Sequence, residues 1–228
     1  GGTSRFGARA NFTLSLGTTS ASSTTPTGSI RFTVDGTLVA TLPLTPEVSP
    51  SVATTALLPG THTIAASYSG DGNFLPGTAS VTHTVTCSTT YTGTVKGSLS
   101  LTGSGKAFCV LNATIGGSLS VGSGAALAVV GSSLPKGSLS AKGSAQLMVC
   151  GTRTGGALTV QGATALVVIG DAGHSRCAPN TIAGTLVLQN DLHGVVAIGN
   201  TASNVITKNI DGPGPYPGDV TTVSGNHP

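Results

Sequence analysis

The first part of the chain alternates apolar and polar residues over short stretches, which predicts β-strands wetted on one face. Ile30, Phe32 and Val34 lie on one side of a stretch that then turns at Asp35-Gly36. Asp-Gly between two alternating stretches is a strong hairpin signal, because both turn positions need a positive φ. Two later stretches alternate in the same way: Ile64, Ala66 and Tyr68, then Ala79, Val81 and Val85. Several short strands at such spacing predict a β-sandwich.

From residue 95 onward the chain repeats a motif of glycine, a small residue and leucine. The motif occurs five times: Gly97-Ser98-Leu99, Gly117-Ser118-Leu119, Gly137-Ser138-Leu139, Gly156-Ala157-Leu158 and Gly184-Thr185-Leu186. The spacings of 20, 20, 19 and 28 residues predict one solenoid coil per repeat, the last widened by an insertion at 171–180. Stacked coils would bury the five leucines as one interior ladder. Residues 93–210 resemble the parallel β-helices of secreted bacterial proteins, and about five coils are expected.

The two strands predicted in each coil differ on their outward side. The first strand alternates leucine with Ser100, Ser120, Ser140 and Thr159, as is typical of a strand that faces solvent. The second strand is apolar throughout, which is the pattern of a strand covered on both faces. Its predicted outward residues form a candidate interface: Cys109, Ala128, Met148, Val167 and Val196. The first domain, the residues after 210 or a neighbouring molecule could cover it, and we favour a neighbour, since large exposed apolar patches are uncommon on monomers.

Residues 60–74 carry a long motif, GTHTIAASYSGDGNF. It resembles the bacterial Ig-like repeat, whose signature there is G-x-H-x-I-x-A-x-Y-x-G-D-x-N-F. The resemblance covers residues 7–86 and implies a disulfide-free sandwich that serves bacterial surface proteins as a spacer or adhesive module, without catalysis. In the family a further strand precedes the segment that Gly7–Leu16 resembles, and only Gly1–Phe6 stand before it here. A sandwich that lacks its first strand exposes a backbone edge, which invites pairing with another chain.

The end of the chain, after the Pro/Gly-rich linker 212–218, is extended and rich in threonine and valine. Residues 219–228 look like the missing opening of the Ig-like repeat, which makes this segment a candidate donor strand. Its central residues are Val220, Thr221, Thr222 and Val223. Donation to the next molecule would be β-strand addition, and such a head-to-tail contact propagates as a filament unless it closes. Two alternatives stay open: a tail that packs on its own solenoid, and tandem repeats of one longer parent chain.

The amino-acid composition narrows the classes of function that we expect. Charged residues are 7% of the 228, against about 25% in an ordinary soluble domain. The ten Lys and Arg are scattered and Trp is absent, so we expect no nucleic-acid partner. The seven carboxylates do not cluster, so we expect neither an enzyme nor a cofactor. No apolar run approaches the roughly 18–20 residues that span a bilayer, which predicts no membrane insertion. Gly1 in place of an initiator Met indicates a processed or excised chain, with any signal peptide removed.

The four cysteines are Cys87, Cys109, Cys150 and Cys177. An even number in such a chain indicates two disulfides formed outside the cytosol, and no spacing fits a zinc motif. Four cysteines allow three pairings. Sequential pairing, Cys87 with Cys109 and Cys150 with Cys177, is the most economical.

A few polar residues could have other chemistry. His174 with Asp171 and Cys177 could contact a metal, but a disulfide-held loop explains the same residues, so we predict no metal site. Asp71 and Asn73 are interpreted as turn formers rather than calcium ligands. Two further histidines, His62 and His83, fall on predicted strands and are interpreted as packed side chains. The serine column could bind glycan chains or ice, although a wet strand surface explains it as well.

The sequence therefore predicts an all-β chain in three parts. Residues 1–86 form an Ig-like β-sandwich without its first strand, residues 87–211 a parallel β-helix with coils of about 20 residues, and residues 212–228 a linker with an extended C-terminal strand. The expected function is that of an extracellular or cell-surface structural subunit of a bacterial assembly or filament, partnered by its own copies. An adhesin or a glycan- or ice-binding module is the alternative.

Overall fold

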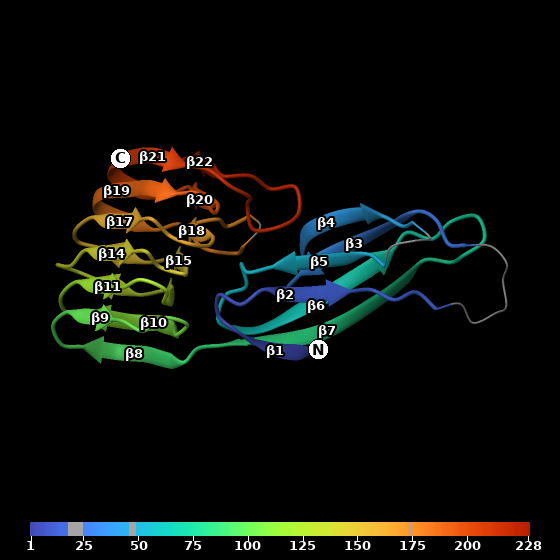
Figure 1. Cartoon of the computed structure of the whole chain (residues 1–228), viewed down its shortest axis with the longest axis horizontal. Helices are drawn as coiled ribbons and strands as arrows, with labels where there is room; N and C mark the ends of the chain where they lie inside the picture. The colour runs from blue at the N-terminus through green and yellow to red at the C-terminus, as the bar shows by residue number, and fades with distance from the viewer. Residues whose placement is uncertain (18–24, 46–48, 174) are drawn as a thin grey trace.

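The computed structural model of the chain describes residues 1–17, 25–45, 49–173 and 175–228. Its regular elements are all strands, and none of the described residues forms a helix long and apolar enough to cross a membrane. An Ig-like domain lies beside a parallel β-solenoid of about 6 turns (Figure 1). The predicted fold class is confirmed.

The Ig-like domain is a sandwich of two unequal sheets. The larger sheet has the order β1 (Gly2–Arg5), β7 (Gly77–Thr86), β6 (Gly60–Tyr68), β3 (Ser29–Val34) and β4 (Thr37–Pro43). The smaller sheet pairs β2 (Ala10–Thr13) with β5 (Ser51–Thr54) in antiparallel register. The predicted hairpin joins β3 to β4, with φ of 49° at Asp35 and 85° at Gly36.

Two expectations about the sandwich need correction. The predicted open edge is occupied on the larger sheet, because β1 pairs in parallel with β7, from Gly2 beside His83 to Arg5 beside Thr86. The edge of β2 that faces away from β5 has no strand partner in the described part of the chain. Ala79 and Val81 were expected in the core, but the smaller sheet is too narrow to cover all of β7, and Gly77–Thr82 are exposed.

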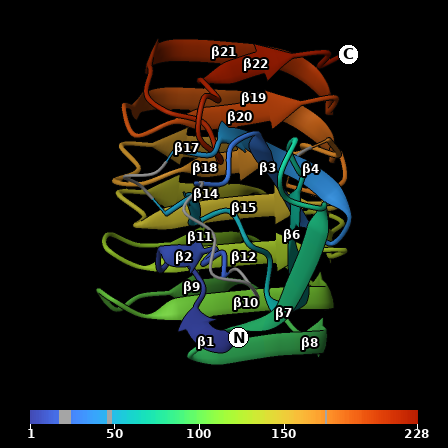
Figure 2. The same cartoon turned by 90° about the vertical axis from the view of Figure 1, so that its right-hand side faces the viewer.

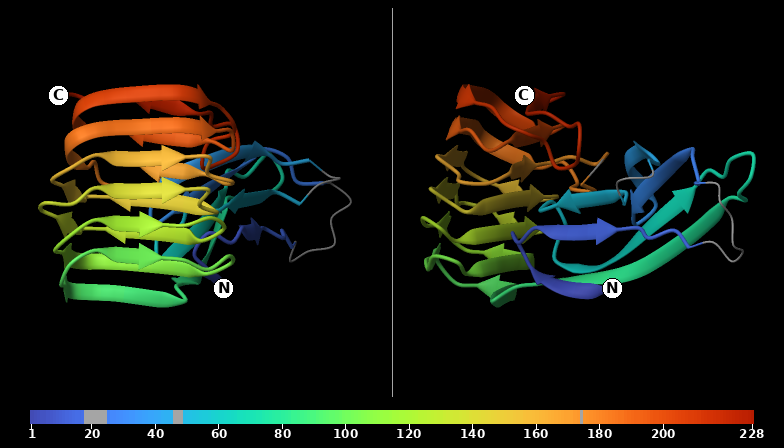
Figure 3. Two further views of the ribbon diagram at one scale, coloured as in Figure 1. Left: turned by 60° about the vertical axis from the view of Figure 1, so that its left-hand side comes forward. Right: turned by 45° about the vertical axis from the view of Figure 1, so that its right-hand side comes forward.

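The solenoid stacks its strands in three parallel columns (Figures 1 and 3). Column one runs through β9 (Leu99–Leu101), β11 (Leu119–Val121), β14 (Leu139–Lys142), β17 (Leu158–Gln161) and the second halves of β19 (Thr181–Asp191) and β21 (Thr201–Ile210). Column two runs through the first halves of β8 (Thr89–Val95) and β10 (Ala107–Ile115), then β12 (Ala126–Val130), β15 (Gln146–Cys150), β18 (Val167–Ile169), β20 (Val195–Ile198) and β22 (Thr222–Ser224). Column three joins the second halves of β8 and β10, then β13 (Ser133–Leu134), β16 (Arg153–Thr154) and the first halves of β19 and β21.

The predicted leucine ladder lies inside the solenoid. Leu119, Leu139, Leu158 and Leu186 are fully buried, and each pairs with the equivalent residue of the coils below and above. Burying one such side chain is worth about 1.5–3 kcal/mol, so the repeated rungs supply much of the free energy that holds the coils together.

The structure has about 6 turns where the sequence predicted five coils, and a third strand segment per coil that was not predicted. The additional turn arises because strands without the Gly-Ser-Leu motif extend the stack at both ends, and β8 precedes the first motif. At the other end β21 continues it with Val205 beside Leu186. The third segments β13 and β16 have two residues each, which is too short for alternation to be visible in the sequence.

A ladder of asparagine side chains lies at the corner between columns two and three and holds the C-terminal segment in place. Asn180 donates its backbone N–H to Oδ1 of Asn200, and Asn200 donates its own to Oδ1 of Asn226, at 2.9 Å in both cases. Nδ2 of Asn226 donates to the carbonyl of Ala197 at 2.8 Å. Together with the parallel pairing of β22 and β20, these bonds make residues 222–226 the last rung of their own solenoid.

Candidate functional site at the domain junction

The outward face of column two is buried against the Ig-like domain, and we take this junction as the candidate functional site. Side chains from both domains form one buried apolar cluster. The solenoid contributes Ala107, Cys109, Ala126, Ala128, Met148, Cys150, Leu166 and Val168, and the Ig-like domain contributes Phe6, Ala10, Ala56 and Leu57 among others. Figure 2 shows the Ig-like strands in front of the stacked coils. The cover is therefore part of the same chain, and the expectation that favoured a neighbouring molecule is corrected.

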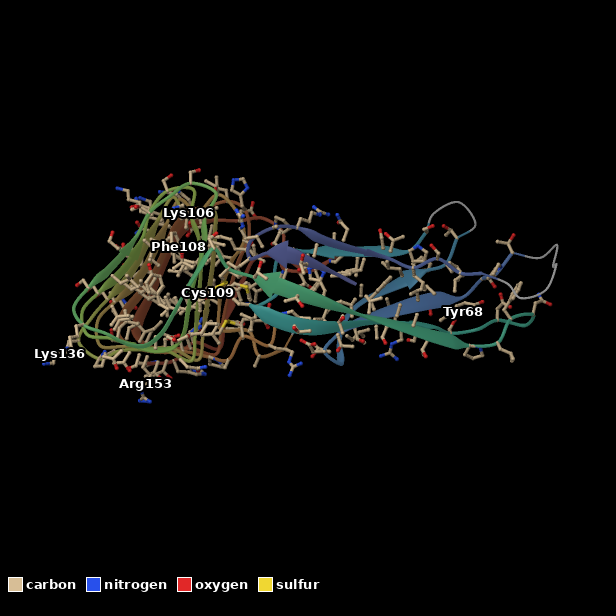
Figure 4. The ribbon with its side chains drawn as sticks, turned by 90° about the horizontal axis from the view of Figure 1, so that it is seen from below. Tyr68, Lys106, Phe108, Cys109, Lys136 and Arg153 are labelled. Atoms are coloured by element: carbon tan, nitrogen blue, oxygen red, sulfur yellow. A yellow bond between two sulfur atoms is a disulfide. The ribbon has the colours of Figure 1, made fainter. Side chains whose placement is uncertain are left out.

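Alternation along β10 separates the two cores. Phe108 belongs to the interior cluster of the solenoid, and Cys109, the next residue, belongs to the junction cluster (Figure 4). The predicted interface residues Cys109, Ala128 and Met148 all lie in the junction. Their exposed fractions are 0%, so the Ig-like domain excludes solvent from them completely.

Val167 was assigned to the wrong face. It lies in the solenoid interior, and Val168 faces the junction instead. The turn before β18 is one residue longer than the turn before β15, because Leu139 pairs with Leu158 while Leu147 pairs with Val167. That extra residue shifts the alternation by one. Val196 is buried, but it lies beside Thr222 of the tail and outside the junction cluster.

Small residues let the two domains approach closely. Gly7 has a φ of 85°, and a Cβ added there would lie 3.1 Å from Cβ of Ala126. That separation is tighter than ordinary side-chain contacts. A glycine is therefore required at this position for both its backbone conformation and its space.

Polar contacts tie three segments of the chain at the junction. Nε2 of Gln146, on the solenoid, donates to the carbonyl of Thr55 at 2.6 Å. Oγ1 of Thr54 donates to the carbonyl of Pro215 in the linker at 2.8 Å. Tyr216 next to it is 4% exposed, and burial raises the pKa of its hydroxyl. The linker thus packs at the junction of the two domains.

A charged cluster borders a cleft of about 400 Å³ at one side of the junction. Nδ1 of His62 lies 2.8 Å from Oδ2 of Asp35, and Nη1 of Arg176, from the solenoid insertion, lies 3.5 Å from the same oxygen. Arg176 also donates to the carbonyl of Asp35 at 3.1 Å. Burial alone would raise the pKa of Asp35, but hydrogen bonds from the His62 side chain and the Thr63 backbone, together with the nearby positive charge of Arg176, hold it below its ordinary value. Of this cluster the sequence indicated only the Asp35-Gly36 turn and His62 in the family motif.

The cleft also contains Ser175, so a serine, a histidine and an aspartate lie close together. A hydrolytic triad needs the serine hydroxyl to hydrogen-bond the histidine nitrogen that faces away from the aspartate. Here Nε2 of His62 lies 2.7 Å from the carbonyl of Leu58. The hydroxyl of Ser175 instead donates to Oδ2 of Asp171 at 2.7 Å. The cluster is therefore arranged as a clamp between the domains.

The insertion 171–180 is organised by a disulfide, Cys150–Cys177, and the second disulfide joins Cys87 to Cys109. The pairing is the sequential one that the sequence favoured. His174, one of the residues weighed for a metal contact, lies outside the described residues. Among the residues that are described, none of the His, Cys, Asp and Glu side chains form a group of three suited to a metal ion.

The remaining candidates occupy structural positions. Oδ1 of Asp71 accepts the backbone N–H groups of Asn73 and Phe74, at 2.7 and 2.9 Å, so Asp71 shapes the turn before β7. His83 packs edge-on against Phe12, with ring centroids 5.2 Å apart. The hydroxyl column stands in register on the outside of column one: Ser100, Ser120, Ser140 and Thr159.

Fold and junction together define a two-domain, all-β protein in which an Ig-like domain is fixed to the flank of a parallel β-solenoid. Residues 1–86 match the family model of the bacterial Ig-like domain (group 3), so the N-terminal domain is a bacterial Ig-like domain. Neither a search of curated proteins nor a search of solved structures gave a match. A bacterial Ig-like domain, a solenoid and two disulfides fit an extracellular or surface protein.

Proposed function

We propose that this chain is a non-catalytic structural module of a bacterial surface protein, in which the solenoid is a stiff block and the Ig-like domain a connector held at a fixed angle. The buried cluster shared by the two domains is the observation that carries the proposal. Two domains joined only by a short linker would reorient freely, whereas a shared apolar core sets one orientation. A fixed orientation is what a load-bearing or spacing module needs.

The arrangement of polar groups supports a role without chemistry. Within the Ig-like domain His62 contacts the carboxylate of Asp35 and the carbonyl of Leu58, and Arg176 of the solenoid reaches the carboxylate and the carbonyl of Asp35 across the junction. Groups used in that way hold the two domains together and are not directed at a substrate.

Rigidity can be tested by small-angle X-ray scattering of the dilute chain. Met148→Lys places a charge in the junction cluster but outside the solenoid interior, so the Ig-like domain should detach and the radius of gyration should rise. Ser140→Lys adds the same charge at an exposed position of the solenoid and is the matched control. Its scattering should equal that of the unmodified chain. An unmodified chain that already scatters as two freely oriented bodies would refute the proposal.

Assembly by a donated strand is a second candidate, favoured by the unpaired edge of β2. Leu16, which follows β2, and Val81, on β7, are 40% and 42% exposed, so the sandwich has apolar surface available to an added strand. Residues 219–228 are a costly donor, because they would have to leave β20 and the asparagine ladder. Fluorescence anisotropy of a labelled 219–228 peptide added to the intact chain tests the acceptor: binding that is lost on Val81→Lys supports donation, and absence of binding opposes it.

A further inference from the structure

Two clefts follow one another along one side of the domain junction, where each coil turns from column one into column two. The upper cleft has a volume of about 480 Å³ and the lower one about 290 Å³. On the solenoid side Ala145 lines the lower cleft, and Thr164, one coil above, lines the upper one. On the Ig-like side the neighbours Ala8 and Arg9 line one cleft each. We call the two clefts together the junction groove, which runs along the stack of coils between the domains.

The junction groove is lined by cations and by no carboxylate. Arg5 and Lys106 line the lower cleft, and Arg9 lines the upper one, where His193 adds an imidazole. Among the described residues that line either cleft there is no aspartate or glutamate. The side chains of Arg9 and Lys106 are exposed and form neither a hydrogen bond nor an ion pair with the part of the chain that the structure describes. Cations gathered in a groove without acids attract an anionic ligand.

Both domains contribute to this positive charge, and one contact connects their contributions. Nη1 of Arg5 donates to the carbonyl of Gly105, the residue before Lys106, at 3.1 Å. This bond crosses the junction and brings a cation of the Ig-like domain to the same cleft as a cation of the solenoid. Like charges repel each other, so an anion bound in the lower cleft would offset that repulsion.

The upper cleft offers surfaces suited to sugar rings. Pro213, Pro215 and Pro217 of the linker line it together with solenoid residues. Such apolar surfaces pack against the C–H faces of sugar rings, and Thr55 and Thr164 add hydroxyl groups that can bond to sugar hydroxyls. An apolar wall with a few polar groups is typical of a ligand site.

The spacing of the charges argues against a densely charged polymer. The groove extends from the turn that contains Lys106 to the turn that contains His193, four coils further along the stack. Neighbouring strands lie about 4.8 Å apart, so the cations are spread over about 19 Å. Duplex DNA has one charge per about 1.7 Å and would leave most of its phosphates unpaired there. The groove therefore fits a polymer with widely spaced charges.

The direction of the strands argues against a peptide. Figure 1 shows that the strands of the solenoid, and β2 and β5 of the Ig-like domain, run across the direction in which the coils stack. A peptide that lies along the groove therefore meets no sheet edge parallel to it, with which its backbone could pair. A sugar chain needs no such pairing.

We propose that the junction groove binds a linear acidic polysaccharide, with its carboxylates at Arg9 in the upper cleft and at Arg5 and Lys106 in the lower one. The sugar chain contacts both domains at once, so this inference rests on the fixed junction of the proposed structural module. It adds a partner to that module, which then attaches to an acidic polymer as well as acting as a spacer.

Isothermal titration calorimetry with two acidic oligosaccharides tests the proposal. The probes are a hyaluronan octasaccharide, in which glucuronate alternates with a neutral sugar, and an oligogalacturonate of the same length. At least one of them should bind, and its binding should weaken as the salt concentration rises. A neutral octamer of N-acetylglucosamine should not bind.

Variants of single cations locate the site. Arg9→Ala and Lys106→Ala each remove a charged contact and should weaken binding about tenfold. Lys136→Ala removes the same charge from another corner of the solenoid, away from Lys106, and is the matched control (Figure 4). It should bind as the unmodified chain does.

The proposal is overturned if neither acidic oligosaccharide binds, if the neutral octamer binds as tightly, or if Lys136→Ala weakens binding as much as Arg9→Ala. Tighter binding of polyglutamate or of single-stranded DNA would also contradict it. Small-angle scattering separates this result from the proposed function, because Arg9→Ala should leave the radius of gyration unchanged. A chain that scatters as one rigid body and binds no acidic sugar refutes the polysaccharide alone.

A chain that scatters as two freely oriented bodies refutes the rigid module instead. In a chain with an intact junction, Met148→Lys should abolish binding as well, because the groove needs both domains in place.

Discussion

The solenoid and the Ig-like domain bury their apolar side chains in different ways. In the solenoid each coil covers the one before it, so burial is complete in the middle and incomplete at the two ends. In the Ig-like domain a two-stranded sheet faces a five-stranded one, and along β7 only His83 and Val85, toward the solenoid, are buried. Phe6 and Val85 are almost fully buried there, whereas Val81 is 42% exposed further out. The coils of the solenoid cover one another, whereas one end of the Ig-like core is covered by the solenoid.

The comparison is tested most strongly by removing one apolar side chain from each core. Leu139→Ala should lower the free energy of unfolding by about 2–5 kcal/mol, because it opens a cavity between two rungs. Val81→Ala should cost less than about 1 kcal/mol, since much of that side chain already contacts water. Denaturant unfolding followed by circular dichroism measures both. Equal losses in the free energy of unfolding would show that the two side chains contribute equally to their cores.

A smaller effect is expected from the glycine at the junction. Gly7 and Gly36 share a φ of 85°, but a Cβ at Gly36 would meet nothing within 4 Å, whereas one at Gly7 would crowd Ala126. Alanine should cost about 1–2 kcal/mol at either position because of the backbone. Gly7→Ala should lose about 1–3 kcal/mol more through overpacking. The difference in the free energy of unfolding between the two variants isolates the junction, and a difference near zero would argue against close contact there.

The smallest effect concerns a buried carboxyl group in the solenoid. Asp191 is 1% exposed, its Oδ1 accepts the N–H of Ala163 at 2.7 Å, and its Oδ2 has no hydrogen-bond partner among the described residues. Burial raises the pKa of Asp191. The folded state is therefore favoured by protonation, and that stability is present below the ordinary pKa and lost as pH rises through the raised one.

Asp191→Asn removes the charge, so it should raise the free energy of unfolding by about 1 kcal/mol at neutral pH. The gain should shrink as the pH falls through the raised pKa of Asp191, where the aspartate takes up its proton. Thermal unfolding across that pH range measures it. Asp211→Asn, at an exposed position, is the control and should change little. A gain that persists in acid would point to packing instead of charge.

Much of the fold could be read from local patterns. The Asp35-Gly36 turn, the leucine ladder and the sequential disulfides depend on neighbouring residues or on a regular repeat, and all three were predicted. The junction was not, because alternation shows that Met148 is covered but not by which surface. Val167 and Val168 exchanged faces through one extra residue in a turn, which a Gly-rich sequence conceals. In the clamp, Asp35 and His62 meet inside the Ig-like domain, but Arg176 reaches them only once both domains are placed.

The pairing of β1 with β7 has a mechanical consequence. In this parallel pair, Gly2 and Thr86 lie at opposite ends of the shared register. A pulling force applied between the N-terminus and the solenoid therefore loads the strands in shear, and the bonds from Gly2 to Arg5 must yield together instead of one at a time. The pairing of β1 with β7 thus opposes extension of the chain.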